Sequence, residues 1–164
     1  MRRATLLAAI ALAALAAGCG RKADHARMTV TTKPNGSVNY TVKGNAGESV
    51  NVVAGEGAAA AAKTPAYAPV FPGAVVQSTM TGAGGEGSGG MVMFQTKAKP
   101  ADVIAFYKDK AKAAGFATSF ESQSGESQMF NAAREQGGEG FQVVATAADG
   151  STTVQLVWSN SNKG

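Results

Sequence analysis

Residues 141–158 constrain the fold more than any other stretch, because apolar and polar residues alternate there on both sides of a turn signal. The signal is Asp149-Gly150, a pair that tolerates the positive φ angles of a tight turn between antiparallel strands. Side chains of a strand point alternately to its two faces, so such a hairpin buries one set and exposes the other. The inward set is Phe141, Val143, Ala145, Ala147, Thr152, Val154, Leu156 and Trp158, and the outward set includes Gln142, Thr146, Thr153 and Gln155.

Residues 100–114 have the period of an amphipathic helix. Val103 and Tyr107 stand four residues apart and begin an apolar stripe that continues through the alanines behind them. Pro100 suits the first helical turn, where its missing N–H group would have no partner in any case. Gly115 can adopt the left-handed conformation that ends a helix. We therefore expect one helix, placed on the apolar face of a sheet.

The strands on either side of this helix complete the predicted domain, residues 70–160. They are expected at Val75–Met80, Met91–Thr96, Ala117–Ser122, Gln128–Ala133, Phe141–Ala147 and Thr152–Trp158. The result is an α+β fold, an antiparallel sheet with one helix packed on one face, in the order β-β-α-β-β-β-β. Residues 81–90 contain six glycines and no bulky side chain, so they predict a mobile hairpin loop. Residues 161–164 are a short tail.

The preceding segment, residues 28–54, alternates apolar and polar residues in three short runs. Asn35-Gly36 is a hairpin signal between the first two runs. We expect a small β meander, which is too small to bury much surface alone and is either a satellite of the main domain or a marginal stalk. Residues 55–69 are rich in alanine, glycine and proline and are interpreted as a linker.

The N-terminal residues have the layout of a secretory signal peptide. Arg2 and Arg3 are followed by an uncharged apolar run that is short for a bilayer span, and then by small residues up to Cys19. We therefore predict a leader at residues 1–18. The alternatives are an ordinary signal peptide or a single-pass anchor, either with an incidental buried cysteine.

The sequence Ala16-Ala17-Gly18-Cys19 resembles the lipobox of bacterial lipoproteins, with Ala16 where leucine is commoner. The resemblance implies that Cys19 carries acyl chains and that residues 19–27 form a lipidated tether. Two acyl chains anchor a protein stably. Gly20 replaces the aspartate that commonly retains such proteins in the inner membrane, which favours the outer membrane with the domain facing the periplasm.

A second resemblance covers roughly residues 69–160. Phe71-Pro72-Gly73-Ala74, a strand pair, the Val-x-x-Phe-Tyr pattern of residues 103–107 and Gly115-Phe116 are similar to a module of bacterial envelope lipoproteins of unknown function. These motifs describe a turn, an amphipathic helix and its end. The resemblance implies no catalytic residue.

Composition argues against most kinds of enzyme. The chain has a single cysteine and a single histidine, His25, so no intramolecular disulfide and no paired metal ligands are expected. Residues 65–164 hold seven basic and eight acidic side chains. A nucleic-acid-binding surface would need clustered basic charge on the folded part, which this balance does not indicate. We expect no cofactor, no metal site and no catalytic site. The weighed alternative is a carboxylate pair drawn from Glu121, Glu126, Glu135 and Glu139.

The expected function is therefore that of a non-catalytic binding or structural protein held in the membrane by acyl chains on Cys19. Its expected partner is another envelope protein or a cell-wall component. The alternative is a carrier of a small apolar ligand or lipid, with the ligand between helix and sheet. An enzyme is the third hypothesis.

Overall fold

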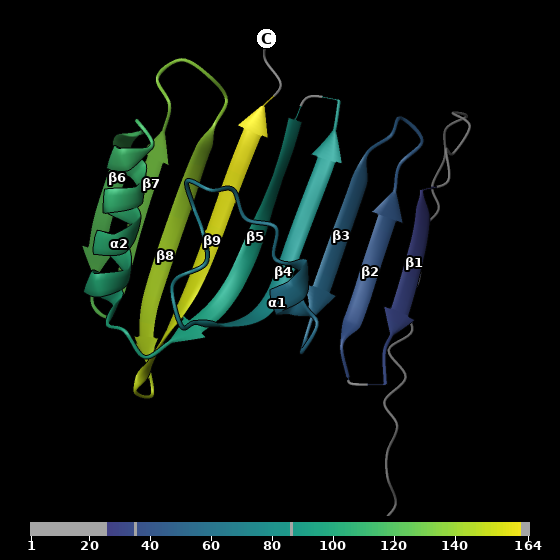
Figure 1. The fold of residues 1–164 in the computed structure, drawn as a ribbon, viewed down its shortest axis with the longest axis horizontal. Helices are drawn as coiled ribbons and strands as arrows, with labels where there is room; N and C mark the ends of the chain where they lie inside the picture. Colours follow the sequence, from purple (N-terminus) through teal and green to yellow (C-terminus); the bar gives the residue numbers. More distant parts are fainter. Residues whose placement is uncertain (1–25, 35, 86, 162–164) are drawn as a thin grey trace, which may run out of the picture.

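The computed structural model describes residues 26–34, 36–85 and 87–161, and shows a nine-stranded sheet with one long helix on one face (Figure 1). The leader, Cys19 and His25 lie outside the described residues. The strands are β1 (Arg27–Thr32), β2 (Val38–Lys43), β3 (Ser49–Ala54), β4 (Val75–Gly84), β5 (Gly87–Thr96), β6 (Ala117–Ser124), β7 (Ser127–Ala133), β8 (Gly140–Ala148) and β9 (Ser151–Ser161), and the helices are α1 (Ala58–Ala61) and α2 (Pro100–Ala113).

All neighbouring strands are antiparallel, in the spatial order β1-β2-β3-β4-β5-β9-β8-β7-β6. The mostly antiparallel α+β architecture predicted from the sequence is confirmed. The predicted hairpin of β8 and β9 is present, with Phe141 opposite Trp158. Asp149 and Gly150 form its turn, and both have positive φ, 47° and 72°.

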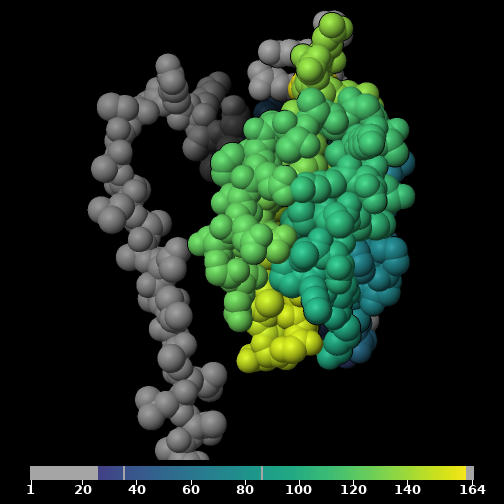
Figure 2. All heavy atoms as spheres, turned by 90° about the vertical axis from the view of Figure 1, so that its left-hand side faces the viewer, coloured from purple at the N-terminus to yellow at the C-terminus, as the bar shows by residue number. Residues whose placement is uncertain are grey.

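Helix α2 packs against β6, β7 and β8. Val103 and Tyr107 are fully buried, as their spacing predicts. Gly115 has a φ of 73°, and the Phe116 N–H donates to the carbonyl oxygen of Ala111 at 2.9 Å, which ends the helix and folds the Phe116 ring onto the core. Figure 2 views this arrangement along the sheet from the β6 edge, with α2 on one side of β6 and β7.

The N-terminal meander extends the main sheet. β3 pairs with β4 along its whole length, with Val52 opposite Met80. Residues 28–54, predicted as a satellite or a stalk, are thus three further strands of the same sheet. Pairing with a long neighbour supplies the support that three strands lack alone.

The predicted mobile loop at residues 81–90 is wrong, because these residues continue β4 and β5 up to the pair Gly84–Gly87. The reason is close packing against β9. A Cβ atom on Gly90 would lie 2.4 Å from the Trp158 ring, and one on Gly89 would lie 2.7 Å from the Trp158 carbonyl oxygen. The glycines therefore let strands and an indole approach closely.

The predicted linker, residues 55–69, is also part of the packed structure. Ala58 in α1 and Ala68 are fully buried, and α1 contacts β3 and β4. The segment then runs across the sheet on the same side as α2 (Figure 1). Its small alanines permit close approach to the sheet, a role that composition alone does not distinguish from that of a linker.

Candidate functional site

The sheet has one covered and one uncovered face. The covered face carries α2 and the segment from residue 62 to residue 74, and its side chains form the core. Opposite residues of an antiparallel pair point to the same face, so the register assigns every strand residue to one face or the other. We call the uncovered one the open face; its large apolar side chains are Met28, Val30, Tyr40, Val42, Val50, Val52, Val75, Met80, Met91, Met93, Phe120, Met129, Val144 and Val157.

The open face holds the most exposed apolar side chains of the described residues. Met28 and Val75 are 69% exposed and Phe120 is 50% exposed. The other exposed large hydrophobic residues lie on the same face: Val30, Tyr40, Val50 and Met80. These exposed apolar residues lie on β1 to β4 and on β6, and between them the open face carries polar residues such as Gln95, Gln155 and Gln142. Exposed apolar patches of this kind mark interaction sites.

The strand residues of the open face are all uncharged, and one charged residue, Glu48 of the β2–β3 turn, lines a depression beside Val50 and Gly82 at its end. Within the described strands, the only charged residues are Arg27, Lys43 and Glu121. Arg27 and Lys43 are paired opposite each other on the covered side, and Glu121 points the same way, where it pairs with Lys108 of α2 at 2.5 Å. The polar strand residues of the open face are neutral. One of them, Gln155, donates a hydrogen bond from its Nε2 to the sulfur of Met91 at 3.0 Å.

Shallow depressions interrupt this face. One of about 300 Å³ is lined by Val50, Met80, Met91 and Val157, by glycines of β4 and β5, and by Trp158. A second, of about 240 Å³, lies near Asn131 and is lined by residues of β6 to β9. Glycines of β4 and β5 thus line the first depression, and residues of β6 to β9 line the second.

The interface between α2 and the sheet is filled. Tyr107, Phe130 and Val143 have no accessible surface, so no void of the size of a water molecule touches them. Aromatic rings close the remaining space: Tyr67 packs on Phe116 with ring centroids 4.7 Å apart. At these residues, where the alternative ligand predicted from the sequence would lie, side chains fill the space between helix and sheet.

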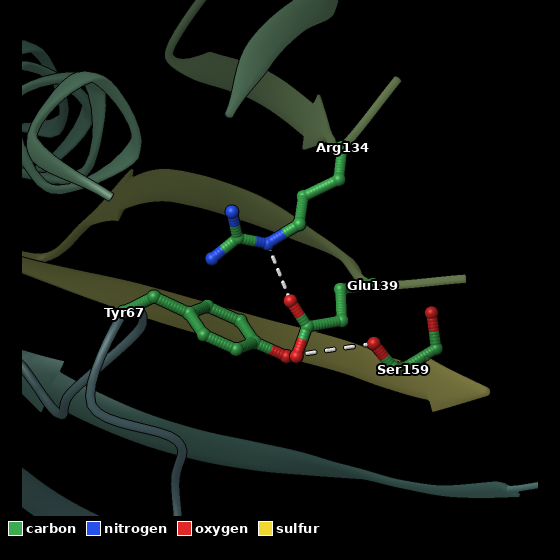
Figure 3. A network of polar contacts seen from close by, with 4 residues as sticks. All are labelled: Tyr67, Arg134, Glu139 and Ser159. Atoms are coloured by element: carbon green, nitrogen blue, oxygen red, sulfur yellow. Dashed lines mark hydrogen bonds and ion pairs between the residues drawn. The ribbon is translucent and has the colours of Figure 1, made fainter. Parts of the chain in front are cut away.

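A polar group closes one end of this core (Figure 3). Arg134 and Glu139, from the two sides of the β7–β8 connection, form an ion pair, and the Arg134 guanidinium lies 4.6 Å from the centre of the Phe116 ring. The Tyr67 hydroxyl donates to the carbonyl oxygen of Ser159 at 3.4 Å. Burial, and then the nearby Glu139 carboxylate, raise the pKa of Tyr67, while Arg134 acts in the opposite direction. These contacts hold the segment at residues 62–74 to the sheet.

Of the four carboxylates weighed as a catalytic pair, two form ion pairs with basic side chains, Glu121 with Lys108 and Glu139 with Arg134, whereas Glu126 and Glu135 have no ion pair among the described residues. Among the described residues, no group of three histidine, cysteine or carboxylate side chains is placed to hold a metal ion. No helix of the described chain is long and apolar enough to cross a membrane. Cys19, the predicted lipidation site, lies outside the described residues.

Fold and surface together define an antiparallel sheet-and-helix protein with exposed apolar side chains on a face whose strand residues are uncharged. The family model described as START domain-like matches residues 76–159, just over half of the chain. The chain belongs to this START domain-like family, whose fold suggests ligand binding. No curated protein and no solved structure matches the chain.

The open face was not found from the sequence. Alternation predicted an outward face with Gln142, Thr146, Thr153 and Gln155, and these residues do lie on the open face. The valines and methionines of β1 to β5 that join them were assigned to no surface. The overlooked signal is the near absence of charged residues from the strands, since a solvated sheet face normally carries polar and charged side chains.

Proposed function

We propose that this chain is a lipid-anchored, non-catalytic binding protein of the cell envelope, whose open face docks a protein partner that presents an uncharged apolar surface. The carrying observation is the set of exposed apolar side chains of β1 to β4 and of β6, which share one face whose strand residues are all uncharged. The membrane attachment is the acylated Cys19 predicted from the lipobox, with the domain facing the periplasm from the outer membrane.

The shape of the face favours a protein over a small molecule. Small-ligand sites are concave and bury most of the ligand surface. The open face offers only shallow depressions, the apolar one between Val50 and Val157 holding about 300 Å³. A broad surface without a deep cavity buries apolar area best against another broad surface, as sheets do when they pack face to face.

Site-specific photo-crosslinking in intact cells tests this docking. A photoreactive amino acid at Met80 lies on the open face, and the same residue at Ala105 lies on the exposed side of α2. We expect a discrete protein adduct from Met80 and none from Ala105. Equal labelling from both positions, or none from Met80, overturns the proposal.

The anchor has its own test. In cells fed a fatty-acid analogue, the wild-type chain should be labelled, and Cys19→Ser should abolish the label because Cys19 is the only cysteine. Labelled Cys19→Ser protein would exclude attachment at this residue.

A second candidate function is an apolar-ligand carrier, which the START domain-like match favours. Because the helix–sheet interface is filled, the ligand would lie in the depression lined by Met80 and Met91. Trp158, the only tryptophan, is among the residues that line it, with its side chain on the covered side of the sheet opposite Phe141. A brominated fatty acid should then quench Trp158 fluorescence in the wild-type chain and not in Met80→Lys. Absence of saturable quenching excludes this carrier function.

A further inference from the structure

We propose that the partner on the open face is a second copy of this chain, so that two copies form a face-to-face β-sandwich. This inference rests on the proposed function, since it names the protein that docks there. Three features of the open face favour a second copy as the partner: its area, the lack of charge on its strand residues and the position of its methionines.

The area is sufficient for a stable dimer. Nine strands at a spacing of about 4.8 Å make a sheet about 40 Å wide, and strands of six to eleven residues are about 20 to 35 Å long. One face then offers about 1,000 Å² per copy, or roughly 2,000 Å² for two, at the upper end of the standard interface range. A smaller partner would leave part of the apolar face exposed.

The absence of charged strand residues makes the face compatible with itself. In a two-fold dimer each copy contributes the same surface, so any charged residue near the axis meets a like charge on its mate. The described strands place Arg27, Lys43 and Glu121 on the covered side, and no charged strand residue points to the open face. Self-association therefore encounters no repulsion from the strands.

The centre of the face is rich in methionine. β5 is the fifth strand of nine, so it lies next to the two-fold axis whichever way that axis runs in the plane between the sheets. Met91 and Met93 of β5 and Met80 of β4 lie there together. Methionine side chains are unbranched and adapt their shape, which suits an interface in which each residue meets copies of itself. Aligned sheets pack about 10 Å apart, a distance that such side chains fill.

Cysteine crosslinking on the full chain in its native membrane tests the dimer. Gln155 is exposed on β9 beside β5, on the open face, and Ala105 is exposed on α2. With a short bismaleimide we expect Gln155→Cys to give a species of twice the chain mass, and Ala105→Cys to give none. The wild-type chain, whose only cysteine is Cys19, sets the background.

A matched pair of charge insertions on the Gln155→Cys chain completes the test. Val30 and Thr31 are adjacent, exposed residues of β1 that point to opposite faces. Val30→Lys should lower the crosslinked fraction several-fold, and Thr31→Lys should leave it unchanged. Equal effects of the two lysines would show contact through the β1 edge and overturn the sandwich.

The outcomes separate this inference from the proposed function. If Gln155→Cys yields only monomer while Met80 photo-crosslinks to a protein of different mass, the second copy is wrong and docking on the open face stands. If neither position yields an adduct, both proposals fail. A doubled mass at both positions, absent from Ala105, supports both.

Discussion

The part of the chain matched by the family and the three strands before it share one sheet but are stabilised differently. Residues 76–159 bury a core between sheet and helix, with Phe94, Leu156 and Phe130 fully inaccessible. β1 to β3 contribute no strand residue to that core, and β1 is exposed along its whole length. One region is held by packing across two layers, and the other mainly by pairing within the sheet, with the short helix α1 as its contact from the second layer.

This difference in packing bears on the apolar residues that β1 to β3 place on the open face. The apolar residues of β1 to β3 stabilise nothing in the isolated chain when they point to solvent, as Met28 and Val30 do. They gain burial only if another surface covers them. Hydrophobic burial contributes about 25 cal/mol for each Å² of apolar area removed from water. Under the proposed docking, the N-terminal strands would gain far more from a partner than the family-matched part would.

Truncation of one apolar side chain in each region gives the largest expected contrast. Leu156→Ala removes a fully buried side chain and should cost about 2–5 kcal/mol of the free energy of unfolding, because it leaves a cavity. Val50→Ala, at a residue that is 40% exposed, should cost less than about 1 kcal/mol. Urea unfolding of both variants measures the difference. Equal losses would show that β3 belongs to the same packed core.

Hydrogen exchange tests the comparison without a mutation. Amides of β9, between β5 and β8, should exchange only through global unfolding, whereas amides of β2 should exchange through local opening. We expect at least about 100-fold slower exchange in β9, which corresponds to roughly 2.7 kcal/mol. Slow exchange in β2 that disappears in the Val30→Lys variant would show that a docked partner supplies the missing protection. Uniform exchange along the sheet contradicts the comparison.

Loss of one hydrogen bond should have a smaller effect, confined to the family-matched part. The Tyr107 hydroxyl donates to the carbonyl oxygen of Pro69 at 2.8 Å and so ties α2 to the segment at residues 62–74. Tyr107→Phe should cost about 1 kcal/mol. Urea unfolding measures it, and Tyr40→Phe, at an exposed tyrosine of β2, is the matched control with no expected loss.

The same tyrosine gives a pH dependence. Burial raises the pKa of Tyr107 far above its ordinary value of 10.0, with a smaller opposing effect of the Phe71 backbone. The unfolded chain loses this proton near pH 10 while the folded chain keeps it, so stability is intact below pH 10 and falls as the pH rises further. Tyr107→Phe should flatten this alkaline decline. An unchanged slope would assign the decline to other groups.

Local signals predicted the parts of the fold that local chemistry decides. Asp149-Gly150 and the alternation beside it specify the β8–β9 hairpin, and Pro100 and Gly115 mark the ends of α2. Gly90 was misinterpreted because its role, making room for the ring of Trp158, depends on a strand 68 residues away in the sequence. Close approach is a tertiary property and leaves no local pattern.

The candidate site was predictable only in part for the same reason. Alternation showed that Gln142 and Gln155 face away from the core, but nothing local showed that β1 to β3 continue the same face. That continuity depends on the pairing of β3 with β4 across the segment interpreted as a linker. The lipidation of Cys19 stays a prediction from the leader.

The smallest expected effect concerns the polar group at the end of the core. Arg134 pairs with Glu139 and covers the Phe116 ring, but its side chain is 39% exposed, so solvent screens the pair. Arg134→Ala should cost less than about 1 kcal/mol through the lost ion pair and cation–π contact. Arg134→Lys separates the two contributions, because lysine keeps the charge and loses the planar group over the ring. Urea unfolding at low and high salt measures both variants. A loss as large as that of Leu156→Ala would show that Arg134 and Glu139 belong to the structural core. A small, salt-dependent loss would show that they lie at its boundary. The stability of the family-matched part then comes from its buried aromatic and aliphatic side chains.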